Sequence, residues 1–353
     1  MKPLKLSDRI YYEVTNGCNL NCIHCCNVSD EKRTFLDADE ILKFHSKLYK
    51  LGIKDSVVTG GEPTLHKDFE KIIEGLCKVG KVVVTSNGIA WSSEKYIDFL
   101  KRNNNVFLQI SLDGFSEKTY DNIRGIGNFR KAMHTIQDIV EEGYAKKIGL
   151  SMTIMNQNIT DVKEVIEFAR KNKIRTVHFP TLIASGNGND NWSKIAPPLN
   201  KQIEIEEYFL GELLKDNKDT YISVNRINQL LAWIRSGYNY DYCCTPTLKV
   251  DPFGNILPCA IASGKVNSIG SIFNMNSIDD FMNILVQNWE LALINHKSGI
   301  EQCKSCTEKD ICPKHFCERC LFMKRSFKTV NEESIKYKCE IYKHHLKNIR
   351  EGK

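Results

Sequence analysis

The chain has 353 residues, and its 49 basic and 43 acidic side chains leave a formal net charge of +6. Hydrophobic residues make up 42% and charged residues 26%, which excludes a disordered or low-complexity chain and is enough for about two domains. No run approaches the roughly 18 apolar residues of a membrane helix, and residues 1–17 lack the apolar segment of a signal peptide. The basic excess is spread along the chain. We therefore expect a cytoplasmic protein that binds neither membrane nor nucleic acid.

Residues 10–180 alternate short apolar runs with longer segments of helical period. The predicted strands are Ile10–Val14, Ser56–Thr59, Lys81–Thr85, Val106–Leu112, Ile148–Ile154 and Thr176–Phe179. The predicted helices between them are Ala38–Leu51, Lys67–Val79, Glu94–Asn103, Asn128–Glu142 and Asp161–Lys171. Six strand-then-helix units predict an α/β fold, a partial (β/α)6 TIM-like barrel. Such folds place their active sites at the C-terminal ends of the strands.

The remaining chain is predicted to contain a connecting region and a cysteine-rich extension. Residues 184–198 are rich in Gly, Asn, Ser and Pro and indicate a linker or an active-site loop, followed by a helix at Lys201–Leu214. From Tyr242 onward we expect short, poorly patterned helices stabilised by bound clusters or metals. The predicted domains are therefore a barrel at 8–183, a linker with bridging helices at 184–241 and the extension at 242–345.

Cysteine is the residue type that most clearly indicates function. The chain contains 14 Cys, of which four fall directly after the first predicted strand: Cys18, Cys22, Cys25 and Cys26. Without a secretion signal the compartment is reducing, so closely spaced thiols indicate metal or iron–sulfur ligands and not disulfides. A zinc site would fit the pair Cys303 and Cys306. The three cysteines spaced Cys-x3-Cys-x2-Cys after the first strand would leave a tetrahedral zinc ion one protein ligand short.

The loop CNLNCIHC, residues 18–25, resembles the Cys-x3-Cys-x2-Cys signature of the radical S-adenosylmethionine (radical SAM) enzymes. The resemblance implies that Cys18, Cys22 and Cys25 hold three irons of a [4Fe–4S] cluster, whose fourth iron chelates S-adenosylmethionine. It also implies that an electron from the cluster releases a 5′-deoxyadenosyl radical, which abstracts hydrogen from an unactivated carbon. Cys26 lies outside the signature and Cys77 in a predicted helix, so we expect neither to be a ligand.

The resemblance also predicts the S-adenosylmethionine site. Its expected residues lie in the cysteine loop and in loops after the following strands: His24, Gly60, Gly61, Glu62, Pro63, Ser86, Ser111, Asp113 and Arg124. Residues 60–63 match the family's GGEP motif, in which paired glycines permit close backbone approach and an acidic group suits the methionyl ammonium. The guanidinium of Arg124 suits a carboxylate. His24 stands where the family usually carries an aromatic residue near the adenine; an exposed loop histidine is the alternative.

The C-terminal cysteines resemble the SPASM domain, which holds two auxiliary [4Fe–4S] clusters. The matching residues are Cys244, Cys259, Cys303, Cys306, Cys312, Cys317 and Cys339, and VDPFGNILPC (250–259) indicates that domain's β-hairpin. By the family's topology one cluster takes Cys303, Cys306, Cys312 and Cys339, and the other takes Cys244, Cys259 and Cys317. The fourth ligand of the latter stays open between Cys320, Cys243 and a substrate group. We favour Cys320 because it lies three residues after Cys317.

Together these resemblances imply an enzyme with S-adenosylmethionine and three [4Fe–4S] clusters, reduced by an external donor such as flavodoxin or ferredoxin. Enzymes with SPASM domains mostly modify peptides or proteins. We therefore expect a ribosomally synthesised peptide as substrate, modified by a thioether or carbon–carbon crosslink, epimerisation or related C–H functionalisation. The alternative is small-molecule oxidation or decarboxylation in cofactor or tetrapyrrole biosynthesis. A non-catalytic electron carrier is disfavoured, because a carrier needs no S-adenosylmethionine pocket.

Three further features bear on the substrate. Ala260 follows Cys259, where formylglycine-forming relatives carry an Asp, so that reaction is disfavoured. The chain starts almost at the first predicted strand, so we expect a leader peptide to dock on the barrel, the linker or a separate protein. The basic segment Lys324–Lys353 is predicted to be a solvated charged tail and not a substrate surface.

Overall fold

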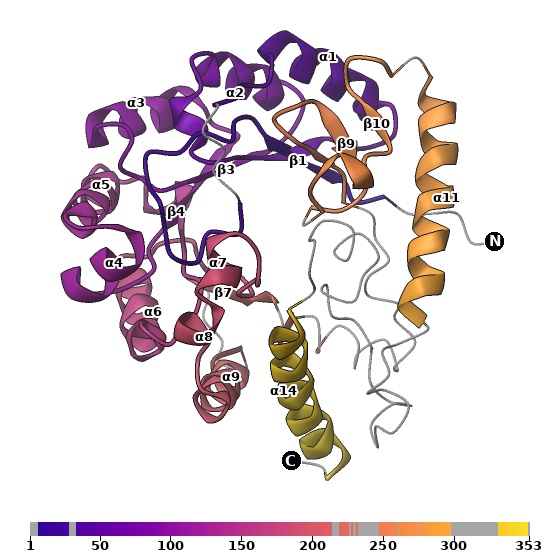
Figure 1. Ribbon diagram of the computed structural model, residues 1–353. Coiled ribbons are helices and arrows are strands. Elements are labelled where there is room, and N and C mark those ends of the chain that lie inside the picture. Colours follow the sequence, from indigo (N-terminus) through magenta and orange to yellow (C-terminus); the bar gives the residue numbers. More distant parts are fainter. Residues whose placement is uncertain are drawn as a thin grey trace.

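The computed structural model contains a ten-stranded sheet whose curved inner part is surrounded by helices (Figure 1). The structure describes residues 6–27, 33–213, 219–225, 227–228, 231, 247–260, 262–275, 277–297 and 331–351. The strand order is β10-β9-β8-β1-β2-β3-β4-β5-β6-β7. Because β10 and β7 form the two ends of this order, the sheet is an open, partial barrel, as predicted.

Seven parallel strands follow one another in chain order across the sheet. They are β1 (Arg9–Glu13), β2 (Asp55–Thr59), β3 (Val82–Ser86), β4 (Val106–Ser111), β5 (Ile148–Ser151), β6 (Thr176–Phe179) and β7 (Tyr221–Val224). The first six confirm the predicted strands, although β5 ends three residues earlier than expected. Strand β7 was not predicted, because four residues with an exposed Tyr221 carry little periodicity.

The predicted hairpin after residue 248 is confirmed, and it extends the same sheet. Strand β8 (Lys249–Val250) pairs parallel with β1, and β9 (Asn255–Leu257) and β10 (Gly270–Ser271) continue antiparallel. The carboxylate of Asp251 accepts hydrogen bonds from the backbone N–H groups of Phe253 and Asn255, both at 2.9 Å, and Gly254 adopts a φ of 79°. Aspartate and a left-handed glycine are typical of such a turn. The domain boundaries inferred from the sequence stay a prediction.

Amphipathic helices cover the outer face of the sheet (Figure 1). They are α1 (Ala38–Tyr49), α2 (Phe69–Cys77), α3 (Ser93–Arg102), α4 (Glu117–Arg124), α5 (Asn128–Glu141) and α6 (Val162–Lys171). In α1, for example, Ile41, Phe44 and Leu48 form one buried stripe. Helix α4 was not predicted, because only two of its eight residues are buried, and its clearest sequence feature is the N-cap of Ser116, which accepts from Thr119 N at 3.1 Å.

The region after β6 corrects two expectations. Residues 184–198, expected as a linker or an active-site loop, contain α7 (Asn187–Asp190) and α8 (Trp192–Ile195), so the segment is partly helical where no helix was predicted. Helix α9 (Leu199–Leu213) follows, as predicted. Helices α11 (Ile278–Lys297) and α14 (Glu332–Arg350) are 20 and 19 residues long, which contradicts the expectation of short helices. Their apolar residues follow the helical period less regularly than those of α1–α6, so the sequence pattern did not reveal their length.

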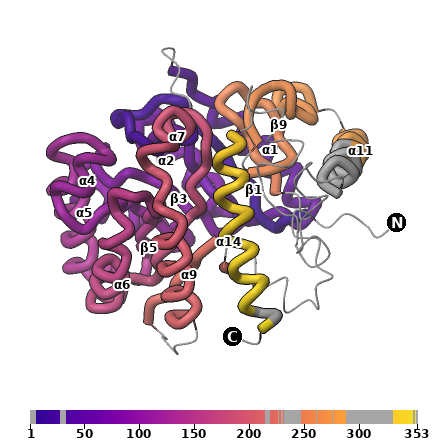
Figure 2. The backbone as a smooth tube through the Cα atoms, turned by 60° about the horizontal axis from the view of Figure 1, so that its bottom comes forward, coloured from indigo at the N-terminus to yellow at the C-terminus, as the bar shows by residue number. Residues whose placement is uncertain are grey.

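Helix α14 also contradicts the prediction of a solvated tail. It packs against α9, and the two helices lie side by side in Figure 2. Ile341 is 0% exposed and Leu346 1% exposed. Nε2 of His345 lies 2.9 Å from the carboxylate of Glu206 on α9, and both side chains are buried. Lys336, Lys343 and Lys347 are exposed, whereas Lys338 is 4% exposed, so only part of the basic charge of α14 faces solvent as the composition indicated.

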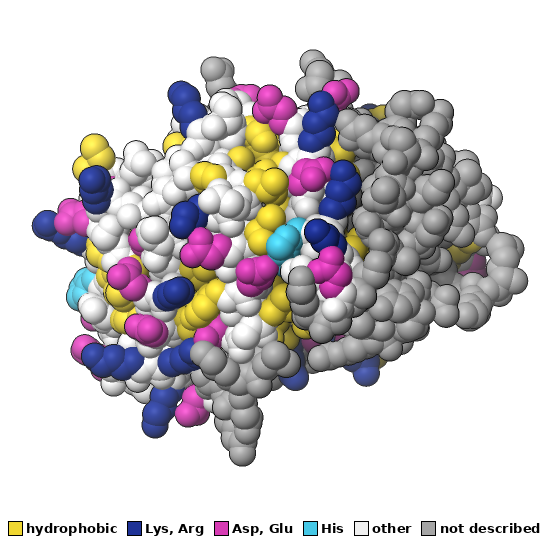
Figure 3. All heavy atoms as spheres, turned by 90° about the horizontal axis from the view of Figure 1, so that it is seen from below, with side chains coloured by type: hydrophobic (Ala, Val, Ile, Leu, Met, Phe, Trp, Pro, Cys, Tyr) yellow, Lys and Arg dark blue, Asp and Glu magenta, His cyan; other side chains and the backbone are white. Residues whose placement is uncertain are grey.

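The face of the molecule shown in Figure 3 carries both acidic and basic side chains. On that face, acidic and basic side chains lie interspersed over the helices, with apolar groups between them. Within the described part of the chain, no helix is both long and apolar enough to span a membrane.

Docking of α14 predicts that its buried residues contribute to stability. We expect Ile341→Ala to lower the free energy of unfolding by about 2–5 kcal/mol, because the substitution leaves a cavity between packed helices. Lys347→Ala is the matched control: its side chain is 71% exposed, and its effect should stay within about 0.5 kcal/mol. Denaturant unfolding followed by circular dichroism measures both. Equal stability of the two variants would contradict the docked helix.

Candidate active site

The C-terminal ends of the strands surround an open cavity of ≈ 280 Å³. Most of the residues predicted to bind the cluster or S-adenosylmethionine line it together: Cys18, Cys22, His24, Cys25, Gly60, Gly61, Glu62, Ser86, Ser111 and Arg124. The lining is completed by residues 180–183, which were not predicted, and by Leu20, Cys26, Thr59, Thr85, Asn87 and Thr153. Pro63 and Asp113 lie behind this wall: Pro63 begins a 3-10 turn, and Asp113 holds other site residues. The structure therefore brings the predicted residues to one place.

The cysteine loop follows β1 and presents three thiols to this cavity. Cys22 is 8% exposed, and Cys18 and Cys25 are half-buried. Burial raises the pKa of Cys18 and raises that of Cys22 and Cys25 to about 11, so the free thiols hold their protons at neutral pH. A cationic centre is needed to hold them as thiolates. Among the described residues, no group of three His, Cys, Asp or Glu side chains is arranged to hold a single metal ion. A four-iron cluster does not need that arrangement, because it binds each thiolate at a different iron.

The paired glycines of residues 60–63 serve the backbone of the cysteine loop. A Cβ on Gly60 would lie 2.3 Å from the carbonyl oxygen of Thr15, and a Cβ on Gly61 would lie 2.2 Å from that of Gly17. Gly61 N donates to Thr15 O at 2.7 Å, and Glu62 N donates to Gly17 O at 2.8 Å. From the sequence, this close approach of the glycine backbone was predicted to be toward a ligand. In the structure the approach is toward the chain that leads into Cys18, which fixes the start of the loop.

Glu62 is a buried acid at the centre of a hydrogen-bonded network. It is 1% exposed; Oε1 accepts from Ser86 Oγ at 2.8 Å and from the hydroxyl and backbone N–H of Thr64, while Oε2 accepts from Asn87 N at 2.7 Å. Burial raises the pKa of Glu62, and the hydrogen bonds from Asn87, Thr64 and Ser86 oppose the rise. A carboxylate lining the cavity in this way is suited to accept from an ammonium group.

Asp113 joins the cysteine loop to Arg124. It is 1% exposed, and its Oδ2 accepts from Arg124 Nε at 2.6 Å and lies 3.3 Å from His24 Nε2. Its Oδ1 accepts from Thr153 N at 2.6 Å. Burial lowers the pKa of His24, so the ring is neutral at pH 7. Nδ1 of His24 is buried without a partner in the described structure, which leaves one unsatisfied acceptor or donor at the wall of the cavity.

Comparison with known proteins gives the family. Residues 12–169 match the Radical SAM superfamily. These residues therefore form a radical SAM domain. It is 25% identical over 306 residues to the mycofactocin maturase MftC of Mycobacterium tuberculosis, covering 85% of this chain and 76% of that protein. It is 26% identical over 316 residues to the subtilosin biosynthesis protein AlbA of Bacillus subtilis, covering 88% of this chain and 66% of that protein.

Solved structures support the fold over nearly the whole chain. The structure of Streptococcus suis SuiB bound to S-adenosylmethionine matches with a TM-score of 0.70 at 16% identity, covering 88% of this chain and 76% of SuiB. SuiB bound to its precursor peptide SuiA matches with a TM-score of 0.65, covering 89% of this chain and 72% of SuiB. The likeness therefore extends beyond the radical SAM domain into the C-terminal region.

The site residues fit the cofactors of a radical SAM enzyme. Three thiols on one loop line a cavity together with Glu62, Arg124 and His24, so a carboxylate and a guanidinium lie at the same site as the sulfurs. Sulfur ligands suit iron–sulfur clusters, and groups of both charges suit the zwitterionic end of S-adenosylmethionine. Radical SAM enzymes bind S-adenosylmethionine and a [4Fe–4S] cluster, and the chemistry of this donor set agrees with both.

The C-terminal cysteines are only partly described. Cys259 lies just after β9 and Cys339 lies in α14, both half-buried. The other predicted auxiliary ligands lie outside the described residues: Cys244, Cys303, Cys306, Cys312, Cys317 and Cys320, together with the alternative Cys243. Cys26 lines the cavity although it is outside the signature, and Cys77 is half-buried in α2.

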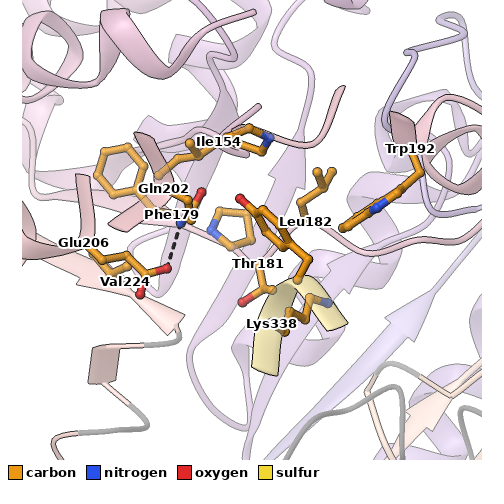
Figure 4. Close-up of a pocket in the computed structure, with 12 residues that line it drawn as sticks. Ile154, Phe179, Thr181, Leu182, Trp192, Gln202, Glu206, Val224 and Lys338 are labelled. Carbon is orange, nitrogen blue, oxygen red and sulfur yellow. Dashed lines mark hydrogen bonds between the residues drawn. The ribbon is translucent and has the colours of Figure 1, made fainter. Parts of the chain in front are cut away.

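Helix α14 lines a small cavity next to the radical SAM cavity. A smaller cavity of ≈ 30 Å³ shares Pro180, Thr181 and Leu182 with the larger one. Figure 4 shows Lys338 of α14 beside Thr181 and Leu182, with Gln202 donating to Glu206 at 2.7 Å on the opposite wall. The C-terminal region therefore contributes directly to the surroundings of the site.

The close approach at Gly61 predicts a strong effect of a single methyl group. We expect Gly61→Ala to displace the cysteine loop, because its Cβ would overlap the carbonyl of Gly17, and to destabilise the protein by about 1–3 kcal/mol. Gly211→Ala is the control: nothing lies within 4 Å of its Cβ, and alanine favours the helix α9. Thermal unfolding compares the two. An unchanged midpoint for Gly61→Ala would contradict the contact.

Proposed function

We propose that this radical SAM enzyme cleaves S-adenosylmethionine reductively and modifies a ribosomally synthesised peptide. The observation that carries the proposal is the convergence of three thiols, Glu62 and Arg124 on one cavity at the C-terminal end of the sheet. When bound, the cluster supplies the electron that splits S-adenosylmethionine into methionine and a 5′-deoxyadenosyl radical. The bond formed in the peptide stays open between a thioether or carbon–carbon crosslink, epimerisation and related C–H functionalisation.

Different residues of the chain would bind the cluster and S-adenosylmethionine. Cys18, Cys22 and Cys25 would hold the cluster. Glu62 would accept from the ammonium of S-adenosylmethionine, and Arg124 would pair with its carboxylate while Asp113 keeps the guanidinium in place. Both charged groups are already ordered by protein hydrogen bonds, so little reorganisation is needed when the ligand binds.

Relatives support a peptide substrate. The proteins that match over most of this chain include a mycofactocin maturase and a bacteriocin biosynthesis protein, and SuiB has been solved with a precursor peptide bound. We infer that the substrate of this chain belongs to the same class. We also propose that the protein works in the reducing cytoplasm, because its closely spaced thiols must stay free of disulfides. An external donor, flavodoxin or ferredoxin, would reduce the cluster.

We also propose two auxiliary [4Fe–4S] clusters in the C-terminal region. One would be held by Cys303, Cys306, Cys312 and Cys339, and the other by Cys244, Cys259, Cys317 and Cys320. Docking of α14 supports this assignment, since it carries Cys339 on a helix that is firmly packed against the barrel. Pairing of β8 with β1 similarly holds the hairpin that leads to Cys259.

Iron content tests the cluster assignment. We expect anaerobically reconstituted protein to hold about 12 Fe, which corresponds to three [4Fe–4S] clusters. Replacing Cys18, Cys22 and Cys25 together with Ala should remove about four Fe, because these thiols form a separate ligand set. Cys77→Ala is the control and should leave the iron content unchanged, since this thiol lies in α2. A wild type that holds only zinc, or a triple variant with full iron, would contradict the assignment.

Turnover tests the substrate class. The reconstituted, reduced enzyme should convert S-adenosylmethionine to 5′-deoxyadenosine and change the mass of a precursor peptide encoded by a small reading frame beside its gene. Chromatography and mass spectrometry measure the two products. The triple cysteine variant should form neither, because it lacks the cluster that supplies the electron. If 5′-deoxyadenosine forms while the peptide stays unmodified and a small molecule is oxidised, the peptide assignment is wrong.

A further inference from the structure

The inner face of β6 carries a histidine that the proposed binding of the cluster and S-adenosylmethionine does not use. Side chains alternate along a strand, and Val177 and Phe179 are packed in the core on the outer face: Phe179 is 1% exposed, and its ring centroid lies 4.7 Å from that of Phe209 on α9. His178 lies between them, so its side chain points to the inner face, where it is half-buried. Two residues further on, Pro180 lines the radical SAM cavity.

The pairing of the strands places three serines in line with His178. The register joins Ser111 of β4 to Ser151 of β5, Ser151 to His178, and His178 to Ser223 of β7. Paired residues of neighbouring strands face the same side of a sheet, so these four side chains form one row on the inner face, which we call the inner row. Ser111 is the end of the row that lines the radical SAM cavity. Neighbouring strands lie about 4.8 Å apart, so the backbone of His178 is about 10 Å from that of Ser111.

The barrel interior is filled one level further from the C-terminal ends of the strands. Gly149 and Thr176 pair with each other there, each two residues before a member of the inner row. A Cβ on Gly149 would lie 2.8 Å from the ring of Phe107 and closer still to the hydroxyl of Thr176, so these side chains leave no room for a methyl group. Beyond Ser111, the members of the inner row are half-buried. A ligand that enters from the radical SAM cavity therefore meets the inner row before it reaches the filled level.

Hydrogen bonds hold the imidazole of His178 from one side. Its Nδ1 lies 3.2 Å from Ser223 Oγ, and this oxygen accepts from Nδ2 of Asn228 at 3.2 Å. In either tautomer Nδ1 is therefore occupied, and Nε2 is the ring nitrogen that forms no hydrogen bond with the described part of the chain. Burial lowers the pKa of His178, so the ring is neutral at pH 7. An ordered, neutral ring with one free nitrogen is suited to exchange a hydrogen bond with an uncharged polar group.

We propose that His178 is a substrate-binding residue whose Nε2 holds the backbone of the peptide next to the residue that the radical attacks. The serine hydroxyls of the inner row can each donate and accept, which suits a peptide backbone that presents N–H and C=O groups in turn. A peptide bound along the row has one residue beside Ser111 at the radical SAM cavity and a neighbouring residue at His178. The row carries no ionised side chain at pH 7, so it selects an uncharged segment. The inference deepens the proposed function and rests on it.

The test is the coupling ratio of the reconstituted full-length enzyme, defined as modified precursor peptide formed per 5′-deoxyadenosine formed. Mass spectrometry and chromatography measure the two products. The amide of an asparagine reaches about as far as Nδ1, so His178→Asn keeps the bond to Ser223 and removes Nε2. We expect this variant to lower the coupling ratio about tenfold, because one hydrogen bond to the peptide is lost, while 5′-deoxyadenosine forms at the wild-type rate. The longer amide of His178→Gln reaches the position of Nε2 and should restore most of the ratio.

His134→Asn is the matched control. His134 lies on α5 with 72% of its side chain exposed, so the same substitution there should leave the coupling ratio at the wild-type value. The inference is overturned if His178→Asn couples like the wild type or if His178→Gln is as uncoupled as His178→Asn. It is also overturned if His178→Asn stops the formation of 5′-deoxyadenosine, because the role of the residue is then structural. A wild type that forms 5′-deoxyadenosine but leaves the peptide unmodified would instead refute the proposed function.

Discussion

The contact between residues 60–61 and the chain before Cys18 is the constraint on which the site depends. Two peptide backbones meet there with no room for a side chain, and hydrogen bonds from Gly61 and Glu62 join the ends of β1 and β2. This contact places the carboxylate of Glu62 and the first cysteine on adjacent walls of one cavity. Glycine is required because only a residue without Cβ permits two backbones to approach this closely.

Buried charge near the cavity is balanced within the protein. Asp113 satisfies Arg124 and lies against His24, and Glu62 is surrounded by N–H and O–H donors. An uncompensated buried charge would be costly, so these partners are what allow buried charged groups to line the cavity. The same partners hold each side chain in position, so the ligand-binding groups are ordered by the fold. Folding and ligand recognition therefore rely on the same hydrogen bonds.

The parts of the fold that follow local periodicity were predictable, and those that depend on distant partners were not. Strands β1–β6 and the residues at their ends follow from apolar runs and motif spacing. Docking of α14 depends on a histidine meeting Glu206 of α9, more than a hundred residues earlier in the chain, and no local pattern reveals that pairing. The bonds from Ser185 and Asn187 to the cysteine loop likewise depend on how the end of β6 meets β1 in space.

Pairing of β8 with β1 gives the first strand a neighbour on each side. Tyr11 N donates to Leu248 O at 2.8 Å, and Tyr11 and Tyr12 lie opposite Lys249 and Val250. Without residues 247–257, β1 would become an edge strand, and its unpaired N–H and C=O groups would be open to pairing with another chain. The C-terminal region thus shields from aggregation the strand that leads into the cysteine loop, so a shortened barrel would be a poor isolated domain.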